Sequence, residues 1–403
     1  MSRDDCPTRS SPGRLSQTAA FTLLASIVVS FLAASTAPSP LYSLYREMWG
    51  FSALTLTFVF AVYAFALLGG LLLFGALSDH LGRRPVLLVA LALELGSTLL
   101  FLAADRVTLL IAARLLQGLA TGVATATLSA ALLDVDRERG ALVNSVAPML
   151  GMALGALGAA ALVQFAPRPA KLVFEALLVL LAFQMVAAFR LPETTARRPG
   201  AWRSMRPRLV IPEAARPTLR MLLPVNTAQW ALGGFYVSLG PSLARSVSGH
   251  SAPLVGGSLI AALVLSGAAG ILAFRLRPAR PVLFGSALAL AAGLLVTLWG
   301  VHAHVTTLLF LGSVIAGVGF GAGFNASVRS LVPLAPPAQR GAMMSSFYAL
   351  SYLAFSVPAL AAGGAVGRLG LEVTALGYGV VLIALSAQAA IRIGARPRLR
   401  AAP

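Results

Sequence analysis

Charged residues are scarce in this sequence of 403 residues. They make up 11% of the chain, whereas 58% of the residues are hydrophobic. A soluble domain normally carries about 25% charged residues, because its surface must be solvated by water. So few charges exclude an ordinary soluble globular fold and indicate a surface that faces lipid.

Acidic residues are scarcer still, because 13 Asp and Glu stand against 31 Lys and Arg, for a net charge of +18. In a soluble protein this excess would suggest a nucleic-acid partner. Here the basic residues lie in short tracts between apolar runs, which is typical of the connections between membrane spans. We therefore expect a lipid bilayer as the surroundings and no nucleic-acid partner.

The chain has one cysteine, Cys6, in its polar N-terminal segment. A single cysteine allows neither a disulfide within the chain nor a cysteine-based metal site. His302 and His304 share a short connection, but a catalytic metal normally needs three protein ligands. No metalloprotease, nucleophile-elbow or P-loop motif is present. We expect no metal, no cofactor and no enzymatic activity.

Twelve apolar runs are each long enough to cross about 30 Å of hydrocarbon as a helix, which takes roughly 20 residues. The predicted spans are Ala19–Ala37, Ala53–Ala76, Pro85–Ala104, Val107–Leu133, Ala141–Phe165, Leu172–Phe189, Leu222–Leu239, Leu254–Phe274, Val282–Val301, Thr306–Ala326, Met343–Val366 and Val373–Ile391. The sequence thus predicts an all-α integral membrane protein.

The basic residues fall unevenly on the two sides of these spans. If the N-terminus is inside, the inner segments hold 24 basic residues and the outer connections hold 6, with Arg114 inside a span. Basic residues favour the cytoplasmic side. We expect both termini in the cytoplasm and a location in the cell inner (plasma) membrane.

The chain divides into two related halves. A shift of 201 positions aligns Gly118 with Gly319, Gly122 with Gly323, and the Arg-Gly-Ala that begins at Arg139 with another at Arg340. We predict an N-terminal tail (1–18), a six-helix bundle (19–189), a cytoplasmic linker (190–221), a second six-helix bundle (222–391) and a C-terminal tail (392–403). Two parallel six-helix repeats are typical of one class of secondary transporter.

The connection between the second and third spans carries the most specific motif. Gly75, Asp79, Gly82, Arg83 and Arg84 stand at fixed spacing there. The segment resembles the signature G-x-L-a-D-r-x-G-r-k of the major facilitator superfamily, with His80 in place of the first basic residue. The resemblance implies a gate: Arg83 and Arg84 would pair with carboxylates such as Asp134 or Asp136.

The fourth span carries a second family-like motif, l-x-x-x-R-x-x-q-G. Arg114, Gln117, Gly118 and Gly122 share one helix face with Thr121. An arginine inside a span is costly and usually faces the bundle interior. The resemblance implies that Arg114 takes part in proton coupling by acting on a nearby carboxylate or water, because arginine itself keeps its proton. The alternative is an arginine that only orders the bundle.

The fifth span resembles the antiporter motif G-P-x-x-G-G, through Pro148, Gly151 and Gly155, although Ala147 and Met152 replace two of its glycines. Ordinary packing of small residues is an equal alternative. Pro192, Glu193 and Thr194, after the sixth span, resemble the family's P-E-T segment. We assign that segment no chemistry.

Polar residues within spans complete the candidates. In the family, spans 1, 4, 7 and 10 line the substrate cavity, so we expect substrate contacts from Asn226, Gln229, Trp230, Tyr236 and Asn325. Glu94 in the third span is either a proton site or a helix–helix hydrogen-bond partner. The mostly apolar and aromatic residues of these spans favour a moderately hydrophobic organic substrate.

These observations predict a monomeric, proton-coupled transporter that exports a small molecule by alternating access. A proton-coupled uptake symporter of a small metabolite is the first alternative. A non-transporting receptor on the same fold is the second, although it would need neither the gating motif nor Arg114.

Overall fold

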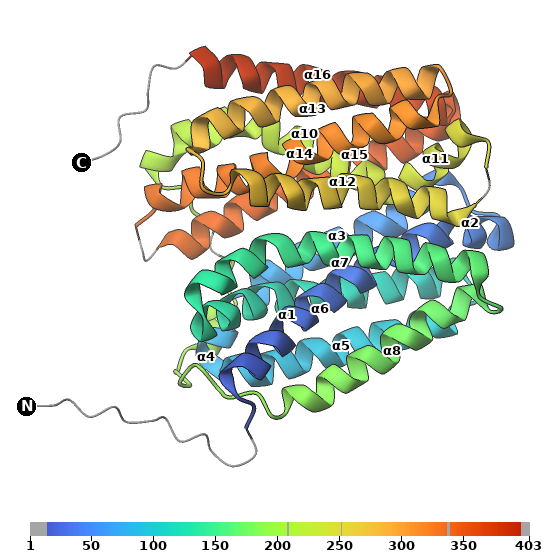
Figure 1. Cartoon of the computed structure of the whole chain (residues 1–403). Coiled ribbons are helices and arrows are strands. Elements are labelled where there is room, and N and C mark those ends of the chain that lie inside the picture. The colour runs from blue at the N-terminus through green and yellow to red at the C-terminus, as the bar shows by residue number, and fades with distance from the viewer. Residues whose placement is uncertain (1–13, 208, 251, 337–338, 396–403) are drawn as a thin grey trace, which may run out of the picture.

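The computed structural model describes residues 14–207, 209–250, 252–336 and 339–395. Most of the predicted N-terminal tail, with Cys6, and most of the C-terminal tail lie outside these residues. The secondary structure of the described residues is helical, with no strand. Figure 1 shows two groups of helices, one formed by the first half of the chain and the other by the second half.

The first half contains α1 (Gln17–Thr36), α2 (Pro38–Trp49), α3 (Ala53–Phe74), α4 (Ser78–Leu81), α5 (Arg83–Ala103), α6 (Val107–Val135), α7 (Arg137–Phe165) and α8 (Pro169–Ala188). The connection holds α9 (Ala201–Ser204) and a 3-10 turn (Glu213–Ala215). The second half contains α10 (Arg216–Ser238), α11 (Gly240–Ser248), α12 (Pro253–Phe274), α13 (Ala279–His302), α14 (Thr306–Leu331), a second 3-10 turn (Val332–Leu334), α15 (Arg340–Leu369) and α16 (Leu371–Ala395).

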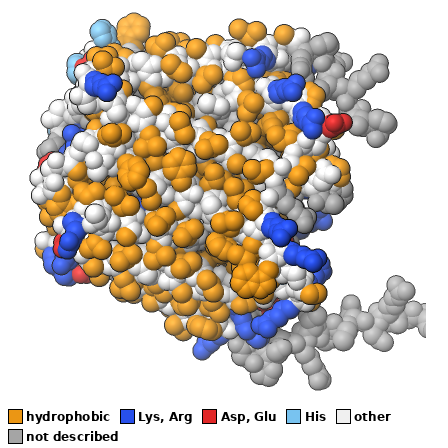
Figure 2. All heavy atoms as spheres, turned by 180° about the vertical axis from the view of Figure 1, so that it is seen from behind, with side chains coloured by type: hydrophobic (Ala, Val, Ile, Leu, Met, Phe, Trp, Pro, Cys, Tyr) orange, Lys and Arg blue, Asp and Glu red, His pale blue; other side chains and the backbone are white. Residues whose placement is uncertain are grey.

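Within the described residues, eleven helical segments are long and apolar enough to cross a membrane. The remaining predicted span corresponds to α10, which carries Pro224, Asn226 and Gln229 and is therefore less apolar. It is buried along most of its length and packs against α14, α15 and α16. All twelve predicted spans are therefore helical, and the predicted fold class is confirmed. Hydrophobic side chains cover the middle of the face seen in Figure 2, and basic side chains gather toward its ends.

Helices begin and end beyond several predicted limits. The seventh span begins at Arg216 rather than Leu222, and the last one continues to Ala395 rather than Ile391. Hydropathy marks only the stretch that crosses hydrocarbon, whereas a helix continues into the polar region of the membrane with charged residues on its surface. The helix ends are therefore more polar than the spans.

The first and seventh spans continue past their predicted ends. After a break at Ala37 the chain forms α2, and after a break at Leu239 it forms α11. Proline is tolerated in the first turn of a helix, so Pro38 and Pro241 redirect the chain without ending helical structure. The connections that hold Arg46 and Arg245 are consequently helical.

The two ends of the bundle differ in how the halves meet. At the end that holds α2 and α11, here called the opposite end, one apolar cluster joins residues of both halves, including Tyr42, Leu56, Phe235 and Leu243. At the end that holds α4, here called the motif end, each half has an apolar cluster of its own. Along the sides, α3 packs against α15 and α7 against α12. The halves are thus sealed at the opposite end.

Candidate functional site

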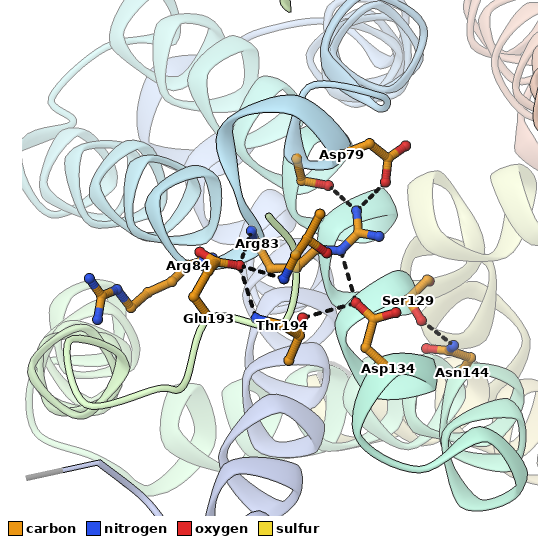
Figure 3. A network of polar contacts seen from close by, with 10 residues as sticks. Asp79, Arg83, Arg84, Ser129, Asp134, Asn144, Glu193 and Thr194 are labelled. Atoms are coloured by element: carbon orange, nitrogen blue, oxygen red, sulfur yellow. Dashed lines mark hydrogen bonds and ion pairs between the residues drawn. The ribbon is translucent and has the colours of Figure 1, made fainter. Parts of the chain in front are cut away.

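The gating motif forms an ion-pair network at the motif end (Figure 3). The Arg83 guanidinium contacts Asp79 Oδ1 at 2.5 Å and Asp134 Oδ2 at 3.1 Å. It also donates to the Ser78 hydroxyl at 2.8 Å. Arg83 is mostly buried beneath these acceptors, whereas Asp79 is more than half exposed. The network therefore ties the turn between α3 and α5 to the end of α6.

The turn itself depends on Gly82. Its φ of 99° lies in the region that favours glycine, and it joins α4 to α5. A Cβ at this position would meet the Glu193 carboxylate. Gly75, at the end of α3, lies near Ala126 of α6. Gly75 thus lies where α3 meets α6, and Gly82 leaves room for Glu193 at the start of α5.

Glu193, to which the sequence assigned no chemistry, has a defined role in this turn. Its carboxylate accepts the backbone N–H groups of Arg83 at 2.7 Å and Arg84 at 3.1 Å, which are the first residues of α5. Thr194 next to it donates its hydroxyl to Asp134 at 2.9 Å. A carboxylate at a helix N-terminus is favoured because the N-terminal N–H groups point outward and carry partial positive charge.

The remaining charged residues of the segment are placed differently from the expected pairs. Arg84 directs its guanidinium at the Phe189 carbonyl at 3.4 Å. Asp136 pairs with Arg139 at 3.6 Å and caps the start of α7. His80 contacts the linker, since its Nδ1 lies 3.1 Å from the Pro199 carbonyl. Of the two arginines, Arg83 is the one that pairs with Asp134.

Arg114 is fully buried, with 0% exposure, and lies between α1, α2 and α3. Its Nε donates to the Tyr42 hydroxyl at 2.6 Å, and its Nη1 donates to the Ser35 carbonyl at 2.8 Å and Gln117 Oε1 at 2.7 Å. The Tyr42, Tyr63 and Phe101 rings surround the guanidinium at 5.2–5.7 Å. In the described part of the chain, its Nη2 has no hydrogen-bond partner.

Gln117 links Arg114 to the second fully buried ionisable residue, Glu94 on α5. Its Nε2 donates to Glu94 Oε1 at 3.1 Å, while its own Oε1 accepts from Arg114. Glu94 is 0% exposed, and its Oε2 has no hydrogen-bond partner among the described residues. Glu94 thus makes the helix–helix hydrogen bond that was one of the two predictions for it.

The glycines of the α6 and α7 motifs pack helices together. Gly118 and Gly122 lie against the backbone of α3, at Tyr63 and Leu67. Gly151 and Gly155 lie against the backbone of α1, and Pro148 faces the space between the halves. Close approach of helix backbones through small residues is the usual role of such positions in membranes.

A cavity of about 350 Å³ lies between the two halves. Some of the residues that line it belong to the stretches 121–129 of α6, 144–152 of α7, 320–328 of α14 and 348–355 of α15. These stretches belong to the parts of the helices nearer the motif end, so the cavity extends from the middle of the bundle toward that end.

The two walls of the cavity differ in chemistry. The first half contributes most of the hydroxyl and amide groups, together with the rings of Phe31, Phe60 and Tyr63; the polar residues are Ser35, Thr36, Thr121, Thr125, Ser129, Asn144 and Ser145. The second half contributes a cluster of rings around Trp230, whose centroid lies 4.8–6.4 Å from those of Phe324, Tyr348, Tyr352 and Phe355. No Asp, Glu, Lys, Arg or His is among the described residues that line the cavity.

Two of the five predicted substrate contacts, Trp230 and Asn325, line this cavity. The other three are buried in contacts within the second half. Asn226 donates to the Ser351 hydroxyl at 3.0 Å, Gln229 to the Gly319 carbonyl at 3.2 Å, and the hydroxyls of Tyr236 and Ser313 lie 2.7 Å apart. In this arrangement these three residues hold helices together rather than face the cavity.

Comparison with known proteins agrees with this architecture. The model of the family described as the Major Facilitator Superfamily matches residues 23–294, which is more than half of the chain. The chain belongs to the Major Facilitator Superfamily. The resemblance seen in the sequence is thereby confirmed, and a small-molecule substrate and a multi-pass membrane location follow from the family.

Solved structures show the same superfamily fold. The human organic anion transporter MFSD10 (TETRAN) aligns with a TM-score of 0.67 at 21% identity, covering 93% of this chain and all of that one. A variant of the nucleoside transporter NupG aligns with a TM-score of 0.70 at 14% identity over the same shares. At these identities the likeness concerns the fold alone.

One sequence relative is more similar but over a short segment. Multidrug resistance protein D of Escherichia coli (strain K12) is 44% identical over 52 residues, which is 13% of this chain and 13% of that protein. A match to so small a part of that protein leaves substrate and direction as matters of proposal.

Proposed function

We propose that this chain is a secondary active transporter that exports a small, moderately hydrophobic organic compound by alternating access. The observation that carries the proposal is the cavity between two six-helix halves that are sealed at the opposite end. Rocking of the halves would open that seal and close the motif end, as in transporters whose substrate lies at the interface of two repeats. The ion pairs of Arg83 with Asp79 and Asp134 would control closure of the motif end.

The chemistry of the cavity supports the choice of substrate. Its volume of about 350 Å³ suits one drug-sized molecule. The Thr121 and Thr125 hydroxyls donate to carbonyls of their own helix, so their oxygens remain as acceptors. The facing wall offers aromatic rings with negatively polarised faces. Acceptors on one side and rings on the other favour an aromatic compound that donates hydrogen bonds.

Proton coupling is supported by the Glu94–Gln117–Arg114 network. Arg114 keeps its proton at ordinary pH, so a carboxyl group must bind and release the coupling proton. Glu94 is the carboxyl group bound to the same glutamine. Tyr63 and Ser35 lie between this network and the cavity, since both line the cavity and both contact Arg114. We propose that loss of the Glu94 proton balances the Arg114 charge and changes the cavity's affinity for substrate.

Orientation and direction complete the proposal. The uneven distribution of basic residues supports a cytoplasmic location for the motif end, with the start of α1 and the end of α16. The cavity would then be accessible to compounds from the cytoplasm or from the inner leaflet of the membrane. The short match to multidrug resistance protein D supports export. A monomer in a bacterial inner membrane would suffice for this mechanism.

The test is retention of lipophilic dyes and antibiotics by cells that lack their main efflux pumps, with and without a protonophore. Wild type would be compared with Arg114→Ala and Asp79→Asn at matched expression. We expect wild type to lower retention, and the protonophore and both substitutions to abolish this effect. Retention that is unchanged by wild type across a broad panel would contradict export of such compounds. Uptake assays and substrate-binding assays would then separate a symporter from a receptor.

A further inference from the structure

A second cavity, separate from the one between the halves, lies on the outside of the second half. It is a groove of about 480 Å³ between α12 and α13, with α14 as its floor. Its lining includes Phe274, Val282, Gly285, Val318 and Ala322. Phe274 and Gly285 are exposed at its rim, whereas Val282 and Ala322 are buried in its floor. In a membrane, this groove faces lipid.

Arginines stand at the motif end of the groove. Arg277 lines it, and Arg275 belongs to the same connection between α12 and α13. Both side chains are exposed, and neither makes a hydrogen bond or ion pair with the described residues. Arg329 holds this connection in place by donating to the carbonyls of Arg277 at 2.8 Å and Phe274 at 3.4 Å. Two unpaired guanidinium groups thus lie on a fixed connection at one end of an apolar groove.

No carboxylate of this half is available to neutralise them. The sequence has no acidic residue between Glu213 and Glu372. Glu213 pairs with Arg216, and Glu372 lies near His304 at the other end of the bundle. The positive charge at the groove is therefore left to be balanced by an anion from outside the chain.

The groove lies at the depth where an amphiphile would present such an anion. α12 has 22 residues, which span about 33 Å at 1.5 Å per residue, close to the thickness of the hydrocarbon core. Residues 275–278 directly follow this helix and therefore lie at the level of the lipid headgroups. The apolar part of the groove extends from there toward the membrane interior, along α13 and α14.

We propose that this groove binds an anionic phospholipid. Its phosphate would lie between Arg277 and Arg275, and one acyl chain would lie along Gly285 and Val318. The ammonium group of a zwitterionic lipid would meet the same two arginines without a carboxylate to receive it, so a lipid with net negative charge is favoured. Basic pockets between membrane helices at the cytoplasmic surface are known to suit anionic headgroups.

Two substitutions test the two parts of the site separately. Arg277→Gln removes a headgroup contact. Gly285→Leu fills the groove, and because the space beside Gly285 is open, the new side chain meets no existing atom at its Cβ. Gly377 on α16 is also exposed with open space beside it. Arg368, at the other end of the bundle, is exposed and makes no side-chain hydrogen bond or ion pair with the described residues. Gly377→Leu and Arg368→Gln are therefore matched controls.

The measurement is native mass spectrometry of the purified full-length chain with phosphatidylglycerol or phosphatidylcholine of identical acyl chains. We expect wild type and both controls to prefer phosphatidylglycerol. In Arg277→Gln its affinity should fall about fivefold, since one arginine near an anionic headgroup is worth about 1 kcal/mol. In Gly285→Leu the binding of phosphatidylglycerol should be lost, because the leucine side chain occupies the place of the acyl chain. The unfolding temperature of each variant in phosphatidylcholine would check that it is folded.

Three results would overturn the proposal. Equal binding of the two lipids would remove the charge selectivity. Unchanged phosphatidylglycerol binding in Gly285→Leu would show that no acyl chain occupies the groove. Displacement of the lipid by millimolar inorganic phosphate would show that the arginines bind free anions without a groove-bound chain.

Discussion

The carboxylate of Glu193 accepts the backbone N–H of Arg83 at 2.7 Å, although the two residues lie 110 positions apart. The contact fixes the chain that leaves α8 to the first turn of α5, beside the pairs that Arg83 makes with Asp79 and Asp134. The linker between the halves begins at this point. Any movement of the motif turn is therefore coupled to the start of the linker.

Replacing Glu193 by alanine should destabilise the protein. The change leaves the N–H groups of Arg83 and Arg84 without their acceptor, and loss of such a cap typically costs about 1 kcal/mol. The unfolding temperature in detergent, followed by tryptophan fluorescence, should fall by a few degrees. Glu213→Ala, which removes an exposed carboxylate near Arg216, is the control. Equal effects of the two substitutions would show that the Glu193 cap adds no stability of its own.

Hydropathy and motif spacing were sufficient for the fold and for part of the motif end. Twelve apolar runs and an internal repeat define the architecture because a bilayer admits few alternatives to spanning helices. The contact between Arg83 and Asp134 could be anticipated because opposite charges end neighbouring spans on one side of the membrane. The cap by Glu193 could not be anticipated, because its partners are backbone N–H groups, and the residue types at positions 83 and 84 do not indicate them.

The sequence says less about which neighbouring helix or cavity each side chain faces. Arg114, Gln117 and Thr121 share a face by their spacing, but spacing does not say what that face meets. In the structure Thr121 lines the cavity, whereas Arg114 is enclosed by Tyr42, Tyr63 and Phe101. Likewise α10 places Trp230 at the cavity and turns Gln229 toward α14. The orientation of these side chains depends on how helices that are distant in the sequence pack against one another. The residue spacing within one helix does not reveal this packing.

Replacing Glu94 by glutamine should separate transport from the proton gradient. Glutamine keeps an oxygen to accept from Gln117 but cannot take up or release a proton. In proteoliposomes we expect a proton gradient to drive uptake of an exported dye into inside-out wild-type vesicles at least ten times better than in Glu94→Gln. Exchange of labelled for unlabelled dye without a gradient should persist in the variant.

Glu175→Gln provides the control for this experiment, since Glu175 pairs with Arg168 at 3.1 Å near the opposite end. Gradient-driven transport that is intact in Glu94→Gln would rule out Glu94 as the coupling carboxyl. Wild-type vesicles that move no substrate at all would instead contradict the proposed transport.

Replacing Trp230 by alanine should weaken substrate binding. Its indole is the centre of the ring cluster, with Tyr352 at 4.8 Å, and each aromatic contact contributes about 0.5–1.5 kcal/mol. If the substrate loses two aromatic contacts with Trp230, its dissociation constant should rise roughly tenfold. Fluorescence anisotropy of a bound dye would measure this constant. Trp299→Ala, at an exposed tryptophan of α13, should leave the constant unchanged. If both variants bound equally well, the ring cluster would have no part in recognition.

Alternating access requires the opposite end to open, and the pair Arg245–Glu47 offers a way to prevent it. Their side chains meet across the halves at 3.5 Å, with Glu47 on α2 and Arg245 on α11. Since Cys6 is the only native cysteine, Glu47→Cys and Arg245→Cys can be introduced into a Cys6→Ser background. Joining the two with a short bismaleimide that contains a reducible disulfide should abolish transport, and reduction should restore it.

The same treatment of Arg168→Cys with Glu175→Cys, a pair within one half, should have no effect. Transport that continues while α2 and α11 are joined would mean that this seal does not open during the cycle, and the rocking mechanism would have to be abandoned.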